Sequence, residues 1–308
     1  MSAGSAVARE WALHLFQMTL QGSLVAALLL AFAAASPQSS PRFRSALLSI
    51  ALAKFVVPPM LPFPTGVFSR FDASPRAFFS RCGVGACAAI ALLHGTGFAV
   101  SLARLVAVRR RARGWVRRSR PLEGSAAGVS AAAEAWISED VAVPCAVGGR
   151  ILLPERLAAA LAKGELEAVI LHEREHLARR DPAMAAFEGF VAAFWWFHPI
   201  ARVLLARRRE IREERCDDAV LRRVSRDTYR RALVAAAAFA GAGRPAASVA
   251  ATGPAAELAR RLRRIADSSP RRRRRIAAAV AVAAATALLL PGVRPAAGPA
   301  FHAERTSR

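Results

Sequence analysis

The sequence predicts a mainly α integral membrane protein, in which a water-exposed α+β domain is inserted between the third and fourth of about four transmembrane helices. Two observations lead to this fold class. The hydrophobic content of 54% is concentrated in long runs without formal charge, and residues 109–270 between two of these runs are rich in charge and in helical periodicity. The chain is therefore expected to divide its residues between a membrane and water.

Four apolar runs are long enough, or nearly long enough, to cross a bilayer as helices. The first is uncharged if His14 is neutral, and it is too long for a cleavable signal peptide. The fourth is rich in alanine and therefore only marginally hydrophobic. We expect three spans within residues 1–108 and one within residues 271–308. They are predicted at about residues 11–36, 45–63, 82–103 and 276–293.

Two polar features interrupt the apolar regions. Lys54 lies near the middle of the second predicted span, where a charge usually faces the interior of a helix bundle and is paired or functional; we favour a structural pairing. Residues 187–205 are strongly apolar but contain Glu188 and Arg202. We therefore expect a core or interfacial helix there and not a fifth span.

Arginine clusters predict the orientation of the chain. Seven arginines fall within residues 109–120 and five form residues 271–275, directly beside the third and fourth predicted spans. Basic flanks favour the cytoplasm, so residues 109–270 should form a cytoplasmic domain, with both termini and a short C-terminal tail outside. The predicted outer loop, residues 64–81, carries three arginines, which opposes this orientation weakly. Arginine outnumbers lysine 43 to 2, which suggests a bacterium with GC-rich DNA and hence its inner membrane.

The formal net charge of +23 also raises the possibility of a nucleic-acid-binding protein. No recognition helix, zinc finger or RNA-binding motif accompanies the arginines. Much of the excess charge lies beside the predicted spans, where anionic lipid headgroups attract it. We therefore expect the arginines to contact membrane lipids, and direct binding of nucleic acid is not expected.

The pattern H-E-x-x-H at His172, Glu173 and His176 is the most informative motif of the chain. Residues four apart share one face of a helix, so both imidazoles can bind one Zn²⁺ while Glu173 lies beside a water molecule. A helix is predicted from Gly164 to Asp181 by helical periodicity, acidic residues in its first turn and basic residues in its last. Two histidines and a glutamate would make a poor hydrophobic core without a metal.

A catalytic zinc site needs a third protein ligand and an open coordination position. A second predicted helix, at about residues 199–223, carries Glu213 and Asp217 four residues apart on one face. One of these acids can bind the metal while the other accepts an imidazole N–H. Glu214 is an alternative to Glu213, and Cys216 is a less favourable candidate because it lies off that face.

This constellation indicates hydrolysis of a peptide bond. Zinc polarises the scissile carbonyl, and Glu173 takes a proton from water and later delivers it to the leaving amine. The tetrahedral oxyanion needs one more donor. His198, Tyr229 and Arg202 are candidates among which the sequence does not choose, and His198 is equally well explained as a core or interfacial histidine.

A β-hairpin is predicted where residues 141–147 and 150–153 flank Gly148 and Gly149. Pro144 should make the first strand an edge strand or a bulged one. An exposed strand beside the metal can bind a substrate backbone as an added strand. A purely structural hairpin is an equally good interpretation.

Four sequence segments together resemble the BlaR/MecR family of membrane zinc metallopeptidases, and more distantly the HtpX and CAAX-type proteases. They are V-P-C-A-V-G-G-R-I-L-L-P (143–154), V-I-L-H-E-R-E-H-L-A-R-R-D (169–181), W-F-H-P (196–199) and E-x-x-C-D-D-A-V (213–220). The resemblance covers about residues 10–292. It implies a gluzincin-like α+β domain with one Zn²⁺ bound by His172, His176 and Glu213. It also implies that Glu173 is the general base and acid, and that Asp217 orients the ligand side chains without binding the metal itself.

Family members that sense antibiotics carry a penicillin-binding domain after the fourth span, whereas here only about fifteen residues follow it, so no such sensor is expected on this chain. The expected substrate is a polypeptide, for example a cytoplasmic transcriptional repressor cleaved in regulated proteolysis. The alternatives are a quality-control protease for membrane proteins and a catalytically silent membrane receptor or scaffold that retains the zinc fold.

Overall fold

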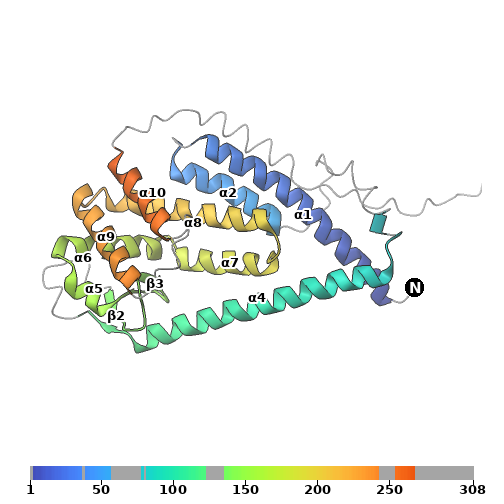
Figure 1. The fold of residues 1–308 in the computed structure, drawn as a ribbon, viewed down its shortest axis with the longest axis horizontal. Coiled ribbons are helices and arrows are strands. Elements are labelled where there is room, and N and C mark those ends of the chain that lie inside the picture. Colours follow the sequence, from blue (N-terminus) through green and yellow to red (C-terminus); the bar gives the residue numbers. More distant parts are fainter. Residues whose placement is uncertain are drawn as a thin grey trace, which may run out of the picture.

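The computed structural model describes residues 3–36, 39–56, 78–79, 81–122, 135–242 and 254–267. This part of the chain is mainly helical and contains one small mixed sheet, as the sequence predicts (Figure 1). The fourth predicted span, the five arginines before it and the C-terminal tail lie outside the described residues. The number of spans therefore remains a prediction.

Among the described residues, two helices are long and apolar enough to cross a membrane, α1 (Ala3–Ala35) and α4 (Val84–Arg118). They cover nearly all of the first and third predicted spans. Helix α1 begins before residue 11, and α4 continues through the basic residues after the third span, because alanine and arginine both favour the helical backbone. Helix α2 (Pro41–Val56) packs against α1 and contains the first part of the second predicted span. The remainder of that span, residues 57–63, is not described.

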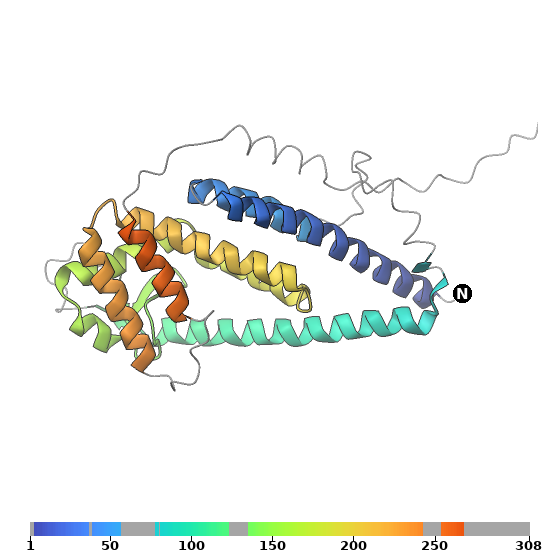
Figure 2. The ribbon, with the colours of Figure 1, turned by 45° about the horizontal axis from the view of Figure 1, so that its top comes forward.

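Residues 187–205 do not form one helix. They belong to two antiparallel helices, α7 (Asp181–Phe194) and α8 (Pro199–Val220), joined by a turn. The chain turns here because Pro199 starts a new helix, and His198 caps that helix by accepting a hydrogen bond from the backbone N–H of Ala201 through Nδ1. The α7–α8 hairpin packs against α1, α2 and α4 and lies between the α1–α2 pair and α4 (Figure 2).

The end of the molecule opposite the N-terminus (Figure 1) holds the sheet, with strand order β1-β2-β4-β3, and the four remaining described helices. Strands β2 and β4 are parallel, and β3 and β4 form the predicted hairpin, in which Gly148 (φ 57°) and Gly149 (φ 80°) both adopt the left-handed conformation. The elements are β1 (Arg120–Pro121), β2 (Ala135–Ile137), β3 (Cys145–Val147), β4 (Arg150–Leu153), α5 (Glu155–Ala160), α6 (Lys163–Ala178), α9 (Arg226–Ala242) and α10 (Pro254–Ala266).

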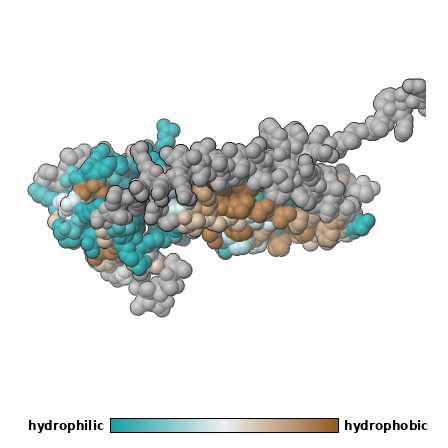
Figure 3. Space-filling model, turned by 90° about the horizontal axis from the view of Figure 1, so that it is seen from above, coloured by the Kyte–Doolittle hydropathy of each residue, from teal (hydrophilic) through white to brown (hydrophobic). Residues whose placement is uncertain are grey.

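Two separate hydrophobic cores correspond to these two halves. One packs the sheet against α6 and α9 and includes Ile151, Ile170 and Tyr229. The other joins α1, α2 and the α7–α8 hairpin and includes Leu29, Leu48 and Trp195. Viewed from above, the hydrophilic surface gathers at the end with the sheet and the hydrophobic surface along the long helices (Figure 3). The mixed composition of the chain thus separates in space, as expected for a protein that contacts both lipid and water.

Candidate metal centre

Helix α6 fixes the two histidines of the H-E-x-x-H motif on the face that looks toward α8. The helix begins where the carboxylate of Glu165 accepts a hydrogen bond from the backbone N–H of Ala162 (3.4 Å). Its apolar side packs into the core beside the sheet and α9. His172 and Glu173 are buried, and His176 follows one turn later.

The side chain of Glu213 on α8 meets both histidines. The Nε2 atoms of His172 and His176 lie 3.2 Å apart, and the Glu213 carboxylate oxygens lie 3.2 Å from the first and 3.6 Å from the second. Ligand atoms bound to zinc at 2.0–2.2 Å in a tetrahedral arrangement are separated by about 3.3–3.6 Å. The three side chains therefore have the spacing and the chemistry of a zinc ligand set, and they leave a fourth position for water or substrate.

A chain of hydrogen bonds orients His172 from behind. The hydroxyl of Tyr229 on α9 lies 2.9 Å from His172 Nδ1 and donates to Asp217 Oδ1 at 2.6 Å. Because the tyrosine proton goes to Asp217, His172 donates its Nδ1 proton to the tyrosine oxygen, which leaves the lone pair on Nε2 for a metal. Asp217 itself lies 3.6 Å from His172 Nδ1, so its influence on the ligand passes through Tyr229.

His176 has a corresponding partner in Asp181. Its Nδ1 lies 2.8 Å from Asp181 Oδ2 at the first residue of α7. Arg180 adopts a left-handed conformation (φ 57°) that turns the chain between α6 and α7 and brings Asp181 back to the histidine. Cys216 Sγ lies 3.5 Å from the same Nδ1, on the opposite side of the ring from Nε2. Cys216 therefore borders the histidine and does not join the three ligand atoms.

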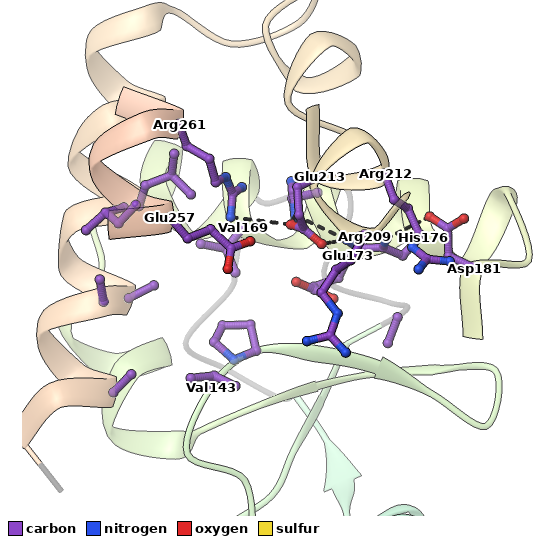
Figure 4. A pocket seen from close by; sticks show the side chains of 18 of the residues that line it. Val143, Val169, Glu173, His176, Asp181, Arg209, Arg212, Glu213, Glu257 and Arg261 are labelled. Carbon is purple, nitrogen blue, oxygen red and sulfur yellow. Dashed lines mark hydrogen bonds and ion pairs between the residues drawn. The ribbon is translucent and has the colours of Figure 1, made fainter. Parts of the chain in front are cut away.

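Arg261 on α10 closes the site from the other side. Its guanidinium donates to both oxygens of Asp217 at 2.6 and 3.2 Å, and to the Tyr229 oxygen at 3.2 Å. It also forms an ion pair with Glu213 at 3.4 Å, which is visible in Figure 4. The neighbouring Arg264 pairs with Asp218. Helix α10 is thus attached to the metal centre by charge.

These surroundings shift the pKa values of the site residues in opposite directions. Burial raises the pKa of Glu173, which suits a group that must accept and release a proton near neutral pH. Burial also opposes ionisation of Glu213, but its contact with His172 and the charge of Arg261 outweigh it and hold its pKa well below the usual range. Burial and the charge of Asp217 raise the pKa of Tyr229, which keeps its hydroxyl protonated as a donor.

A cavity of about 540 Å³ opens in front of the ligands. Strand β3 pairs only with β4, so it lies at an edge of the sheet, and Val143, Pro144 and Ala146 of this segment form one wall of the cavity. Apolar side chains of α9, such as Leu233 and Ala236, form a second wall, and α10 adds Leu258 together with the charged Glu257 and Arg261. Figure 4 shows Glu173 between Val143 of the strand segment and the ligand residue Glu213. A polypeptide lying along β3 would pass directly beside the carboxylate of Glu173.

The structure separates the three candidate oxyanion donors. Tyr229 lies in the site, but its hydroxyl is engaged with His172 and Asp217. His198 lies in the turn of the α7–α8 hairpin, 3.1 Å from Ser23 Oγ of α1, and Arg202 donates to the backbone carbonyl of Trp196. Neither of the last two lines the cavity.

Two residues of the site were not found from the sequence. The sequence marks Asp181 only as the end of the predicted helix, although an acid five residues after a histidine can reach its ring if the chain turns sharply. Arg261 is 48 residues beyond Glu213, in one of several arginine clusters, and no local pattern distinguishes it from its neighbours.

The described residues define a class: a mainly helical protein with two candidate membrane spans and a partly buried His-His-Glu group that could hold a metal beside a buried glutamate. Comparison with family models identifies the group of proteins more closely. Residues 68–265 match the family of the BlaR1 peptidase M56, and the chain belongs to that family. A comparison with curated proteins finds none that matches the chain. The family is one of metallopeptidases, and the resemblance seen in the sequence is thereby confirmed.

Proposed function

We propose that this protein is an integral membrane zinc-dependent endopeptidase that cleaves polypeptides on the cytoplasmic side of a bacterial inner membrane. The observation that carries the proposal is the convergence of His172, His176 and Glu213 on one point, with the buried carboxylate of Glu173 beside it. The donor set matches zinc, which prefers imidazole and carboxylate ligands in a tetrahedral arrangement.

The protein groups divide the chemistry among themselves. When bound, zinc lowers the pKa of water to about 7 and polarises the scissile carbonyl. Glu173 takes the proton of the attacking water and passes it to the leaving amine, a role that its raised pKa supports. The edge strand β3 holds the substrate backbone, and the apolar side chains of α9 receive a side chain next to the cleaved bond.

The biological role that we propose is regulated proteolysis, for example cleavage of a transcriptional repressor, because the family is that of the BlaR1 peptidase. Quality control of membrane proteins is an alternative with the same chemistry. A silent receptor or scaffold is less well supported, because a protein that only binds metal for stability has no need of a buried Glu173 beside the ligands.

The test compares the detergent-purified protein with three variants in zinc content and in cleavage of casein or of itself. Wild type and Glu173→Gln should both hold about one zinc, whereas only wild type should cleave, because an amide cannot carry the proton. His172→Ala should lose the metal. Glu175→Gln is the matched control, since Glu175 is on the same helix but pairs with Arg179 outside the cavity; it should retain both zinc and cleavage.

The outcomes separate the alternatives. Full cleavage by Glu173→Gln would show that another group activates the water. Zinc binding by wild type without cleavage of any substrate would favour the silent scaffold. The absence of zinc from all four proteins would contradict the metal centre itself.

A further inference from the structure

The turn of the α7–α8 hairpin is bonded to three apolar helices at once. His198 Nε2 lies 3.1 Å from Ser23 Oγ of α1, and the indole N–H of Trp195 donates to the Phe55 carbonyl of α2 at 3.0 Å. On the third side, His94 Nε2 of α4 lies 3.1 Å from the carbonyl oxygen of Phe194. These contacts fix the depth of the turn relative to the membrane spans.

That depth is the middle of the spans. Ser23 is at the centre of the uncharged run 11–36 of α1, and His94 is near the centre of the run 82–103 of α4. Close packing supports the same level: a Cβ atom at Gly97 of α4 would lie 2.2–2.5 Å from the indole of Trp196. We therefore propose that the α7–α8 hairpin is a re-entrant element that enters the bilayer from the domain side, contacts lipid acyl chains and turns back at mid-depth.

The backbone of the turn is compatible with such an environment. Irregular backbone is tolerated at membrane depth only where protein groups satisfy its hydrogen bonds. The N–H of Trp195 donates to the Val191 carbonyl, that of His198 to the Trp195 carbonyl, and that of Ala201 to His198 Nδ1. Arg202 is the first charge after the turn along α8, and its guanidinium donates to the Trp196 carbonyl, the arrangement that lowers the cost of an arginine in a membrane.

The hairpin also presents an apolar surface that the other described residues leave exposed. Phe187, Phe190 and Phe197 are 38–47% exposed, and Val203 is 57% exposed. Glu188, the one acid within residues 187–207, is buried and paired with Arg208 and Arg212. Lipid chains are the occupant that fits, because the exposed side chains of α4 at the level of the turn, such as Leu93, are also apolar.

The positions of the charged residues along α8 agree with a turn at the middle of the bilayer. From the turn at His198 to Arg207 is nine residues, or about 14 Å of helix, close to half of the ~30 Å hydrocarbon thickness. The run Arg207, Arg208 and Arg209 thus begins where acyl chains end and phosphate headgroups begin. Glu213 lies about 9 Å further along the helix. The hairpin would therefore hold the metal centre at the surface of the membrane.

Spin labels can measure this depth in the full chain reconstituted in lipid. A label is attached at Phe197→Cys of the turn, at Leu93→Cys of α4 and at Arg223→Cys of the water-exposed domain, with the native cysteines replaced by alanine. The proposal predicts that Phe197 resembles Leu93, with high accessibility to oxygen and low accessibility to a water-soluble nickel complex, while Arg223 shows the reverse. A pattern at Phe197 like that of Arg223 would overturn the proposal. Low accessibility to both reagents would also overturn it, because protein and not lipid would then cover the turn.

A second measurement does not depend on removing cysteines. Phe197→Trp in the otherwise unchanged chain adds one fluorophore at the turn. Lipids brominated near the ends of their acyl chains should quench the added emission more strongly than lipids brominated near the headgroup. The opposite order would contradict the re-entrant hairpin even if the cysteine-free protein failed to fold.

Discussion

At the scale of single residues, Tyr229 has a different place from the one expected from its chemistry. A tyrosine near a zinc site is a reasonable oxyanion donor, but here its hydroxyl is held between His172 Nδ1 and Asp217, 2.9 and 2.6 Å away. It is also bonded to Arg261. A hydroxyl engaged in this way sets the tautomer and orientation of a ligand, so its contribution should appear in metal affinity.

Replacing Tyr229 by phenylalanine removes only this hydroxyl. We expect zinc affinity to fall by about 10- to 100-fold, as for other groups that orient a ligand from behind, while cleavage at saturating zinc is largely retained. Competition with a chelating dye measures the affinity, and cleavage is measured over a series of zinc concentrations. Unchanged affinity together with a large loss of kcat would instead support a direct role for Tyr229 at the oxyanion.

At the scale of elements, the α7–α8 hairpin is held together by a buried acid between two arginines. Glu188 of α7 accepts hydrogen bonds from Arg208 at 2.8 Å and from Arg212 at 2.7 Å, and Arg208 also reaches Ser49 of α2. Removing one member of such a group leaves the others buried without a counter-charge. The group therefore locks α7 to α8 and the hairpin to α2.

Glu188→Ala should destabilise the protein by about 3–5 kcal/mol, the usual cost of breaking a buried ion pair. Unfolding in detergent micelles, followed by circular dichroism, measures the change. Glu139→Ala is the control, because Glu139 is exposed, and an exposed substitution should change the stability by no more than about 0.5 kcal/mol. Equal stabilities of the two variants would show that Glu188 does not lock the hairpin.

The elements also show what the sequence could predict and what it could not. The α6 helix with its two histidines and the glycine hairpin follow from local spacing, because the bonds concerned lie within a few residues or depend on helical periodicity. The choice of Glu213 over Asp217 as the third ligand rests instead on the resemblance to the BlaR/MecR family. The separation of α7 from α8 depends on a cap by His198 and on packing against three other helices. The attachment of Arg261 to Asp217 joins residues 44 apart and depends on where α10 packs. Tertiary contacts of this kind have no local pattern.

At the scale of the whole molecule, the orientation in the membrane decides which compartment supplies the substrate. Helices α1 and α4 both begin at the end of the molecule away from the sheet and run toward the end that holds it, where α4 finishes beside the strands (Figure 1). The seven arginines of residues 109–120 lie at the end of the molecule that holds the sheet. By the distribution of positive charge, this end should face the cytoplasm.

Labelling with a membrane-impermeant maleimide tests the orientation in a cysteine-free background. Arg223→Cys should react in inverted membrane vesicles and not in spheroplasts, and Val84→Cys at the start of α4 should react in spheroplasts. The reversed pattern would place the metal centre outside the cell and would exclude a cytoplasmic repressor as its substrate.

If the hairpin is anchored at mid-depth, the distance between the metal centre and the membrane surface depends on the thickness of the bilayer. The distance from His198 to Glu213 along α8 is fixed by helical geometry at about 22 Å, whereas hydrocarbon thickness differs among membranes by several ångströms. In a thick bilayer the cavity would sink toward the headgroups, and in a thin one it would rise clear of them. Lipid composition could then change which polypeptide segments reach the cavity without any change in the protein. A membrane whose thickness responds to stress would act directly on such an enzyme.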